Sequence, residues 1–438
     1  MSPPLNLLLV CYHDPDSNLI GPTRVRKFAE NFTASGCSVK VLSRSGVTSY
    51  AQGPPSTEAL VPRPKVGVPQ GVSVGPARSA ESMTRWATTP GRVRHLWSAV
   101  RPKLTWVFRH VVAVPDREVF SVRTLFRHAR DLGDWAPAVI VASGPPFSAF
   151  FVAARIARQG GVPWVADYRD LWTVSSYYLL GPVRRRVDRA IESRLLRTVS
   201  LVTTVSQPLA DEMHHAFGVR SEVVLNGYDP SDLATLTPAS DERSGLPLRI
   251  VYAGEIYEGK RDPEPLFIAL ASMGLGPHQV LVEFYGDTVQ PVEDAARRHG
   301  VECLVRCGPR LPHTESVALQ QGADVLLLLT WNDPGERGVY TGKLFEYLGA
   351  RRPILMLGFP EGVAADLVRC RDAGVIANDP DDIAVAVRRW LALKEETGLV
   401  PLLPESVSAG LTRQEQSDRL HVLCVSLMSN SNKDVVHQ

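Results

Sequence analysis

Two successive runs of alternating apolar and amphipathic segments constrain what this chain can fold into. In the first run, LNLLLVCY (5–12) and AVIVAS (138–143) are continuous apolar stretches, typical of strands buried on both faces of a parallel sheet. The rhythm restarts at LRIVYAG (248–254), after PSDLATLTPASDERSGLP (230–247), which has the composition of a linker. The alternation predicts an α/β fold of two doubly wound, Rossmann-like domains that face each other across a cleft.

The length of the chain sets the domain boundaries that we expect. We place a first domain at 1–240 and a second at 248–400, because 438 residues are too many for one ordinary core. We expect the C-terminal segment 401–438 to cross back to the first domain with an amphipathic helix. Residues 51–80 contain six Pro and four Gly, which predicts a long mobile loop over about 45–90.

Apolar spacing orients two helices of the first domain. We expect Thr23 to cap a helix that buries Val25 and Phe28, and this βαβ opening lacks the GxGxxG fingerprint of dinucleotide-binding enzymes. A second helix is predicted over 182–197, with the run Arg184–Arg186 on its solvent side. Its buried face is expected to consist of the apolar residues Val183, Val187, Ile191 and Leu195.

Charge is distributed unevenly along the chain. Residues 1–240 carry 28 Lys and Arg against 18 Asp and Glu, whereas residues 241–438 carry 20 against 28. A basic half suits nucleic acid or an acidic or membrane-borne substrate. No recognition helix or aromatic-interleaved RNA motif is present, so we expect no nucleic acid. The basic segment 91–130 forms either solvated surface helices or a patch that meets an anionic membrane surface or a lipid-phosphate acceptor.

Other features point to the cytoplasm. The six cysteines show neither CxxC nor zinc spacing, as expected for reduced thiols. The opening MSPPLNLLLV lacks the basic region of a signal peptide, and no apolar run approaches the roughly 20 residues that span a bilayer. We therefore predict a cytoplasmic protein, whose segment 91–130 offers peripheral contact with the inner membrane face.

The stretch YTGKLFEYLGARRPIL (340–355) has the features of a ligand site at the start of a helix. Thr341 is a candidate N-cap, and Gly342 allows a ligand to approach the backbone closely. Lys343 adds a positive charge, and Glu346 lies one turn into an otherwise apolar helix. A helix N-terminus of this kind attracts anions, phosphate above all.

Six segments, taken in order, resemble retaining glycosyltransferases of the GT-B fold, the large group called family 4 or the glycogen-synthase-like superfamily. The segments span nearly the whole chain and are GPTRVRKFAENF, PWVADYRDLW, VTTVSQPLADEM, VVLNGYD, YAGEIYEGKRDP and TGKLFEYLGARRPIL. The resemblance implies an enzyme that moves a sugar from a nucleotide diphosphate to an acceptor hydroxyl with retention at the anomeric carbon. The first domain would bind the acceptor, a glycan, a lipid-linked group or a small natural product. The second would bind the nucleotide sugar as a substrate, and no cofactor is expected.

The resemblance also assigns donor-site residues. Lys260 and Arg261 follow the first strand of the second domain and would stabilise the leaving diphosphate, beside Gly254 at the end of that strand. Backbone amides of Gly342 and Lys343, with Thr341 at the helix start, would bind the diphosphate, and Glu346 would accept hydrogen bonds from the ribose. The base would be held at Arg310 and Leu311. No carboxylate pair is placed to hold a divalent ion, so we predict no metal.

In the first domain, Arg169 and Asp170 are the candidate catalytic residues. Asp170 would orient a hydroxyl of the acceptor or of the donor sugar, or would instead form a salt bridge with Arg169 that fixes the loop. The acceptor would meet the first strand-to-helix loop, at Gly21, Thr23 and Arg24.

The sequence departs from the family pattern at one position. Many relatives carry a glutamate eight residues before the position of Glu346, in contact with the transferred sugar, but Gly338 stands there and Glu336 is out of register. This departure leaves two other classes open. One keeps the fold but changes the reaction, as in a sugar-nucleotide epimerase or a C–N-coupling pseudo-glycosyltransferase. The other is a non-catalytic protein that binds nucleotide or nucleic acid.

Overall fold

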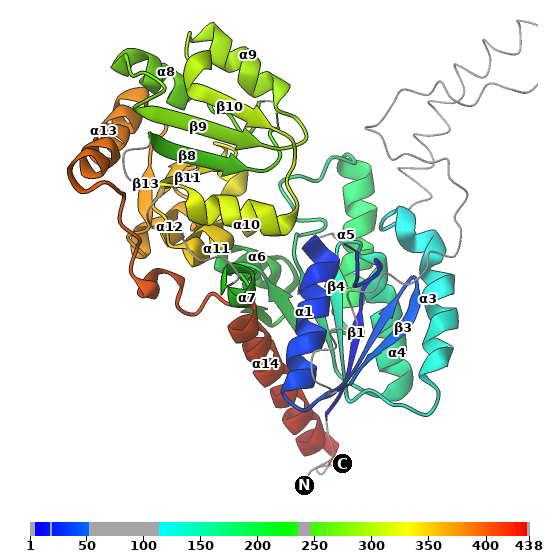
Figure 1. Ribbon diagram of the computed structural model, residues 1–438. Coiled ribbons are helices and arrows are strands. Elements are labelled where there is room, and N and C mark those ends of the chain that lie inside the picture. The colour runs from blue at the N-terminus through cyan, green and yellow to red at the C-terminus, as the bar shows by residue number, and fades with distance from the viewer. Residues whose placement is uncertain (1–4, 18–19, 52–113, 235–246, 258, 436–438) are drawn as a thin grey trace, which may run out of the picture.

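A computed structural model describes residues 5–17, 20–51, 114–234, 247–257 and 259–435. The expected mobile loop lies outside these ranges from residue 52 on, as does the basic segment 91–130 up to residue 113. The described chain forms two α/β domains, each built on one twisted sheet (Figure 1). The predicted fold class, two doubly wound domains, is confirmed.

The first sheet has seven strands in the order β3-β2-β1-β4-β5-β6-β7. All neighbours are parallel except the edge pair β2 and β3, which is antiparallel. Its strands are β1 (Asn6–Val10), β2 (Ser38–Ser43), β3 (Gly46–Tyr50), β4 (Val139–Gly144), β5 (Trp164–Tyr168), β6 (Leu201–Thr204) and β7 (Ser221–Val223). The start of the predicted loop is therefore an edge strand, β3. It pairs with β2 through a tight turn at Arg44 and Ser45, and the Pro and Gly content farther along the chain does not reveal this pairing.

Helices cover both faces of the first sheet. Leu7 and Leu9 pack on α1 (Ile20–Ala34), while Leu8 and Val10 face the helices of the opposite side. Those helices are α3 (Val122–His128), α4 (Ser148–Gly160), α5 (Pro182–Leu196) and α6 (Gln207–Phe217), with short 3-10 turns η3 (Arg117–Ser121) and η4 (Ala129–Leu132). This alternation along one strand is what a sheet buried on both faces requires.

The second sheet has six parallel strands in the order β10-β9-β8-β11-β12-β13. They are β8 (Leu248–Ala253), β9 (Val280–Tyr285), β10 (Val305–Gly308), β11 (Val325–Leu329), β12 (Ile354–Leu357) and β13 (Gly374–Ile376). The surrounding helices are α7 (Pro230–Ala234), α8 (Glu264–Met273), α9 (Gln290–Arg298), α10 (His313–Gly322), α11 (Gly342–Ala350), α12 (Val363–Cys370) and α13 (Pro380–Thr397), with 3-10 turns η5 (Glu302–Leu304), η6 (Pro334–Glu336) and η7 (Glu405–Ser408).

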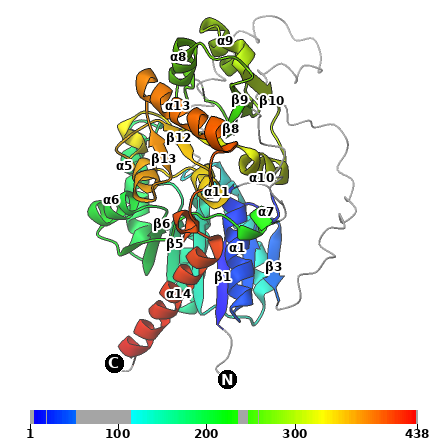
Figure 2. The same cartoon turned by 60° about the vertical axis from the view of Figure 1, so that its left-hand side comes forward.

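The last helix, α14 (Arg413–Val435), returns to the first domain and lies beside α1 (Figures 1 and 2). Leu420 and Cys424 complete the core between this helix and the first sheet, and Asn31 Nδ2 donates to Ser417 Oγ at 2.9 Å. The two crossings between the domains run side by side. Tyr228 N donates to Leu411 O at 3.2 Å, and Arg413 N donates to Tyr228 O at 2.9 Å.

Helix α5 is rotated relative to the face predicted from its apolar residues. Val183 and Val187 are 73% and 48% exposed, whereas Arg184, Asp188 and Glu192 are buried. These three charged side chains, spaced four residues apart, lie on one face. Asp188 and Glu192 bind the chain that follows β5, and Arg184 forms an ion pair with Asp188. Hydrogen bonds between α5 and that loop, rather than burial of apolar residues, set the orientation of the helix.

Candidate functional site

The candidate site lies where the strands of the second sheet end and the first domain begins. Gly254 follows β8 directly, Lys260 and Arg261 follow a few residues later, and α11 starts after β11. In open α/β sheets, ligands bind at the carboxyl ends of strands, where the strand order reverses. Here β9 and β11 flank β8 on either side, so the reversal falls at β8.

Lys343 connects the start of α11 with the end of β8. Its side chain lies across the backbone of Gly254, so that a Cβ at residue 254 would overlap Lys343 Cε. Burial lowers the pKa of Lys343, while the charge of Glu346 opposes that shift and the nearby Arg261 and Arg310 add to it. Several cations therefore converge at this point, and among the described residues no carboxylate forms an ion pair with the Lys343 ammonium, as an anion site requires.

The N-terminus of α11 is open to a ligand. Thr341 occupies the N-cap position with extended dihedral angles (φ −81°, ψ 143°), but its hydroxyl does not cap the helix, and this buried group has no hydrogen-bond partner among the described residues. Gly342 is exposed, and a Cβ there would meet no atom within 4 Å. The first N–H groups of a helix have no partner within the helix, so those of α11 point into free space beside Gly342.

Glu346 is half-buried one turn into α11. Its Oε2 accepts a hydrogen bond from Nε2 of the buried Gln320 at 3.1 Å. The Glu346 carboxylate interacts electrostatically with His313 and Arg413, the first residues of α10 and α14. The pKa of His313 is raised chiefly by its hydrogen bond to Asp232, at 3.0 Å, and Glu346 adds to that shift. Sequence reasoning missed Gln320, His313 and Arg413, because only the fold brings α10 and α14 beside α11.

Lys260 and Arg261 are held differently. The exposed Lys260 ammonium lies 4.6 Å from the ring centre of Trp331 and 5.5 Å from that of Tyr177. Arg261 donates from Nη1 to Glu255 O at 3.0 Å. Lys260 is therefore placed by cation–π contacts that a diphosphate can replace, whereas Arg261 also fixes the loop after β8.

The predicted base-binding residues follow β10. Arg310 is exposed and forms ion pairs with Glu255 at 3.5 Å and Asp287 at 3.2 Å, and Leu311 beside it is half-buried. Burial and the neighbouring carboxyl of Asp287 raise the pKa of Glu255. The pair of carboxylates thus holds Arg310 close to Lys343.

The two domains meet beside this site. The Tyr177 hydroxyl of the first domain donates to Glu336 Oε1, and Ser206 Oγ donates to Gly338 O at 2.6 Å. A Cβ at Gly338 would lie 2.9 Å from Leu209 Cδ2 of α6. The position at which the resemblance places a sugar-binding glutamate is therefore packed against the first domain, and a side chain there requires the Leu209 side chain to shift.

The acceptor role expected for Arg24 is contradicted. Its five N–H donors already have five acceptors within the protein: both oxygens of Asp167, the carbonyls of Val224 and Leu225, and Asn226 Oδ1. Arg24 is 4% exposed. The same segment does not form a strand-to-helix loop, because α1 begins at Ile20 and includes Gly21 and Thr23 in its first turn. Thr23 is therefore inside the helix rather than its cap.

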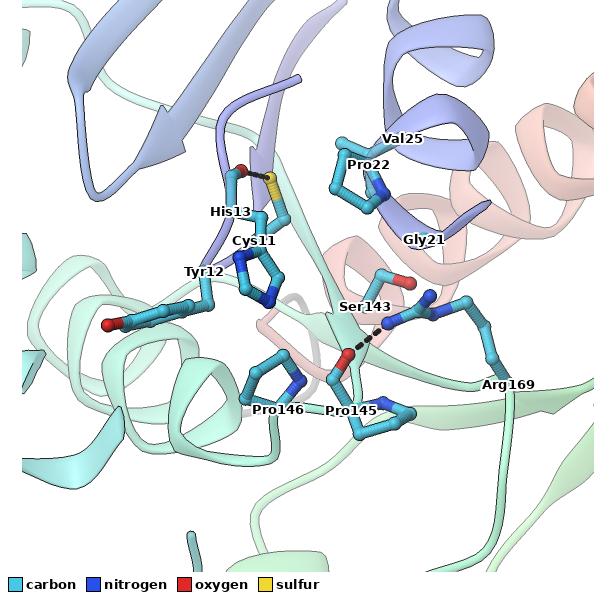
Figure 3. Close-up of a pocket in the computed structure, with 10 residues that line it drawn as sticks. All are labelled: Cys11, Tyr12, His13, Gly21, Pro22, Val25, Ser143, Pro145, Pro146 and Arg169. Carbon is cyan, nitrogen blue, oxygen red and sulfur yellow. Dashed lines mark hydrogen bonds between the residues drawn. The ribbon is translucent and has the colours of Figure 1, made fainter. Parts of the chain in front are cut away.

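Arg169 lies against Gly21, on a small pocket at the first turn of α1 (Figure 3). Its Nη2 donates to Pro145 O, and its buried Nε has no hydrogen-bond partner in the described part of the chain. A Cβ at Gly21 would overlap Arg169 Nη1. The pocket brings these groups together with Cys11, Tyr12, His13, Pro22, Val25, Ser143 and Pro146.

Asp170 does not pair with Arg169. In the part of the chain that the structure describes, its carboxylate makes neither a hydrogen bond nor an ion pair. Desolvation raises the pKa of Asp170, and the charge of Arg169 opposes the shift. Asp170 instead lines a second, larger pocket that also includes Tyr177. The salt-bridge alternative is thus excluded for these described residues.

Three other features bear on the predictions. All six cysteines are unpaired. Across the described ranges, no group of three or more His, Cys, Asp or Glu side chains is arranged to hold a metal ion. Every described helix is also too short or too polar to cross a bilayer.

Comparison with known proteins agrees with this geometry. Residues 21–228 match the family described as the glycosyl transferase 4-like domain. The sucrose-phosphate synthase of Thermosynechococcus elongatus superposes with a TM-score of 0.57 at 13% identity, over 99% of this chain and 100% of that chain. Anabaena HepE in complex with UDP and glucose gives 0.59 at 13% identity, over 96% and 100%. No curated protein matches the sequence. The GT-B fold and the glycosyltransferase resemblance are confirmed.

Proposed function

We propose that this chain, which carries a glycosyl transferase 4-like domain on a GT-B fold, moves a sugar from a nucleotide-diphosphate donor to an acceptor hydroxyl with retention of anomeric configuration. The convergence of Lys343 on Gly254, at the open N-terminus of α11, carries this proposal. A helix N-terminus and converging cations suit a group that gains negative charge as a bond breaks.

The diphosphate would lie between α11 and the loop after β8. Amides of Gly342 and Lys343 would donate to its oxygens, and Lys260 would leave its aromatic neighbours to meet the developing charge. Arg310, already beside Lys343, would add to the positive field. Because these groups supply the charge stabilisation, we propose that transfer needs neither a metal ion nor a cofactor.

Glu346 would bind the ribose. One of its oxygens accepts from Gln320, which leaves the other oxygen and further lone pairs for two neighbouring hydroxyls. His313 and Arg413 nearby keep negative charge favourable at this position. The donor is therefore held at both ends of its nucleotide part.

The acceptor would approach from the first domain. In a retaining transfer without a covalent intermediate, the leaving phosphate takes the acceptor proton, so Asp170 would orient the acceptor hydroxyl rather than act as an obligatory base. With Gly338 packed on α6, contact with the transferred sugar would come from Glu336 or from side chains of the first domain.

Thermal-shift measurements with UDP, GDP, TDP and ADP, and with their sugars, test the donor site, because a ligand that binds only the native state raises the melting temperature. HepE was crystallised with UDP and glucose, so UDP-glucose is the first donor to test. Donor consumption is then followed with and without an acceptor, in EDTA. Turnover that needs no acceptor would indicate an epimerase, and failure of every nucleotide to shift the melting temperature would contradict the proposal.

A further inference from the structure

A pocket of about 460 Å³ opens on the first domain beside the donor site, and the assignments above make no use of it except at Asp170. Its size falls within the range of roughly 300–1,000 Å³ that encloses small organic ligands. Aromatic, proline and leucine side chains form most of its lining, among them Phe147, Trp172, Tyr177 and Tyr178. Three carboxylates lie among them, Asp116, Glu118 and Asp170.

The pocket walls are rigid. Phe147 and Trp172 stack with ring centres 5.3 Å apart and planes 13° from parallel. The Tyr178 hydroxyl donates to Asp188 Oδ2 at 2.8 Å, and Glu192 Oε2 accepts from Thr173 N at 3.2 Å. The buried charged face of α5 therefore holds the loop 172–178 in place. A pocket that is already ordered loses little entropy when a ligand binds.

The lining has a single sign of charge. Among the residues that the structure describes, no Lys, Arg or His side chain lines the pocket, and Asp170 has neither a hydrogen-bond nor an ion-pair partner. A phosphate placed here would lie among these carboxylates, of which Asp170 is exposed and Asp116 already accepts hydrogen bonds from Ser148, and the like charges would repel one another. A neutral or cationic group with a flat apolar body would instead bury its faces against the aromatic rings.

The pocket adjoins the donor site through one residue. Tyr177 lines the pocket and also contacts Trp331, with ring centres 5.9 Å apart, and Lys260. A ligand that fills the pocket would therefore lie against Tyr177, whose ring also contacts the Lys260 ammonium.

We propose that this pocket binds the body of the acceptor, and that the acceptor is a neutral or cationic molecule with a flat apolar part rather than a phosphate-bearing lipid. The inference rests on the proposed sugar transfer for its function, but not for the binding itself. It extends the acceptor site from the first turn of α1 to the loop 172–178.

Binding of a matched pair of probes tests the proposal. The full chain is titrated, without nucleotide, with 4-methylumbelliferone at mildly acidic pH, where its phenol is neutral, and with 4-methylumbelliferyl phosphate, followed by fluorescence anisotropy. We expect the neutral probe to bind about tenfold or more tightly than the phosphate ester, which corresponds to about 1.4 kcal/mol. Equal or tighter binding of the phosphate ester, or no binding of the neutral probe, would overturn the proposal.

Variants locate the binding. Leu180→Trp fills the pocket from its half-buried rim and is expected to weaken the neutral probe about tenfold. Asp170→Asn is expected to strengthen the phosphate ester several-fold, because a like charge is removed. Asp134→Asn, an exposed aspartate outside the pocket, is the matched control and is expected to change neither probe.

UDP affinity, measured on the same variants, separates the two proposals. If Leu180→Trp keeps its melting temperature and UDP affinity but still binds the neutral probe as wild type does, the pocket assignment is wrong and the donor site stands. If the probe binds as expected but no nucleotide does, the pocket stands and the proposed sugar transfer fails.

Discussion

The side chain of Lys343 lies across the backbone of Gly254, at the point where the first strand of the second domain ends. A side chain on residue 254 would occupy the space that the Lys343 side chain now fills. Residue 254 must therefore be glycine so that the Lys343 ammonium can lie in this position. Backbone conformation is not the reason, because the φ of Gly254 does not lie in the left-handed region.

Gly254→Ala is expected to displace Lys343 and to weaken nucleotide-diphosphate binding about tenfold, by loss of one charge-assisted hydrogen bond. The fold should be kept, because the displaced atoms are the end of a flexible side chain. Gly322→Ala is the control, since a Cβ there meets only Arg249 Nη1, at 3.8 Å. Calorimetric titration with the diphosphate measures the effect, and an unchanged affinity would remove Lys343 from the donor site.

Glu346→Ala is expected to lower nucleotide affinity by about ten- to a thousandfold, since hydrogen bonds to a charged group contribute roughly 1.5–3 kcal/mol each. The free energy of unfolding should change little, because Gln320 Nε2 keeps a second acceptor, Ser316 Oγ, at 3.3 Å. Glu361→Ala, an exposed glutamate before α12, should leave affinity unchanged. Wild-type affinity in Glu346→Ala would show that the ribose assignment is wrong.

Lys260→Ala is expected to reduce kcat by about ten- to a hundredfold while donor affinity changes much less. The reason is that the ammonium rests on Trp331 and Tyr177 before it meets charge that develops only as the diphosphate leaves. Steady-state kinetics combined with direct titration of the nucleotide measure the two effects. A loss confined to affinity would make Lys260 a ground-state ligand.

Arg24→Met is expected to lower the free energy of unfolding by about 3–5 kcal/mol, the usual cost of leaving one member of a buried ion pair alone. Burial alone would raise the pKa of Asp167, and Arg24, Ser143 and Thr203 together lower it. Arg26→Met breaks only a surface contact with Glu30, 3.7 Å away, and should cost about 0–1 kcal/mol. Urea denaturation compares the two, and equal effects would refute a structural role for Arg24.

His313 gives stability a specific pH dependence. Its folded-state pKa is raised by Asp232 and Glu346, so protonated His313 stabilises the native state. That contribution is fully present below the unfolded value of about 6.5 and is lost as the pH rises through the raised pKa. His313→Gln should therefore lower the melting temperature at acidic pH and much less at alkaline pH. A difference that is independent of pH would contradict the assignment.

Sequence pattern predicted the sheets well because strands buried on both faces read as continuous apolar runs, as LNLLLVCY does for β1. It failed on α5, where apolar spacing favoured Val183 but the buried face carries Asp188 and Glu192. Asp188 and Glu192 are buried because residues of the loop 172–178 donate hydrogen bonds to their carboxylates, and that loop is not adjacent to them in sequence. Sequence pattern predicted a helix start at Thr341 and Gly342, where α11 begins, and the ligand roles of Lys343 and Glu346 stay predictions. It assigned Arg24 to a ligand because the five acceptors of Arg24 come from β5 and from residues that follow β7, which are distant in sequence.

Topologically, the second domain is an insertion. The chain leaves the first domain at Tyr228 and returns at Thr412, and the two crossings are hydrogen-bonded to each other. Removal of the residues between these two points would leave two chain ends that are already in contact, and α14 would still pack on α1. The second domain can therefore be exchanged between relatives through two cuts at one place in space, without rebuilding the first domain.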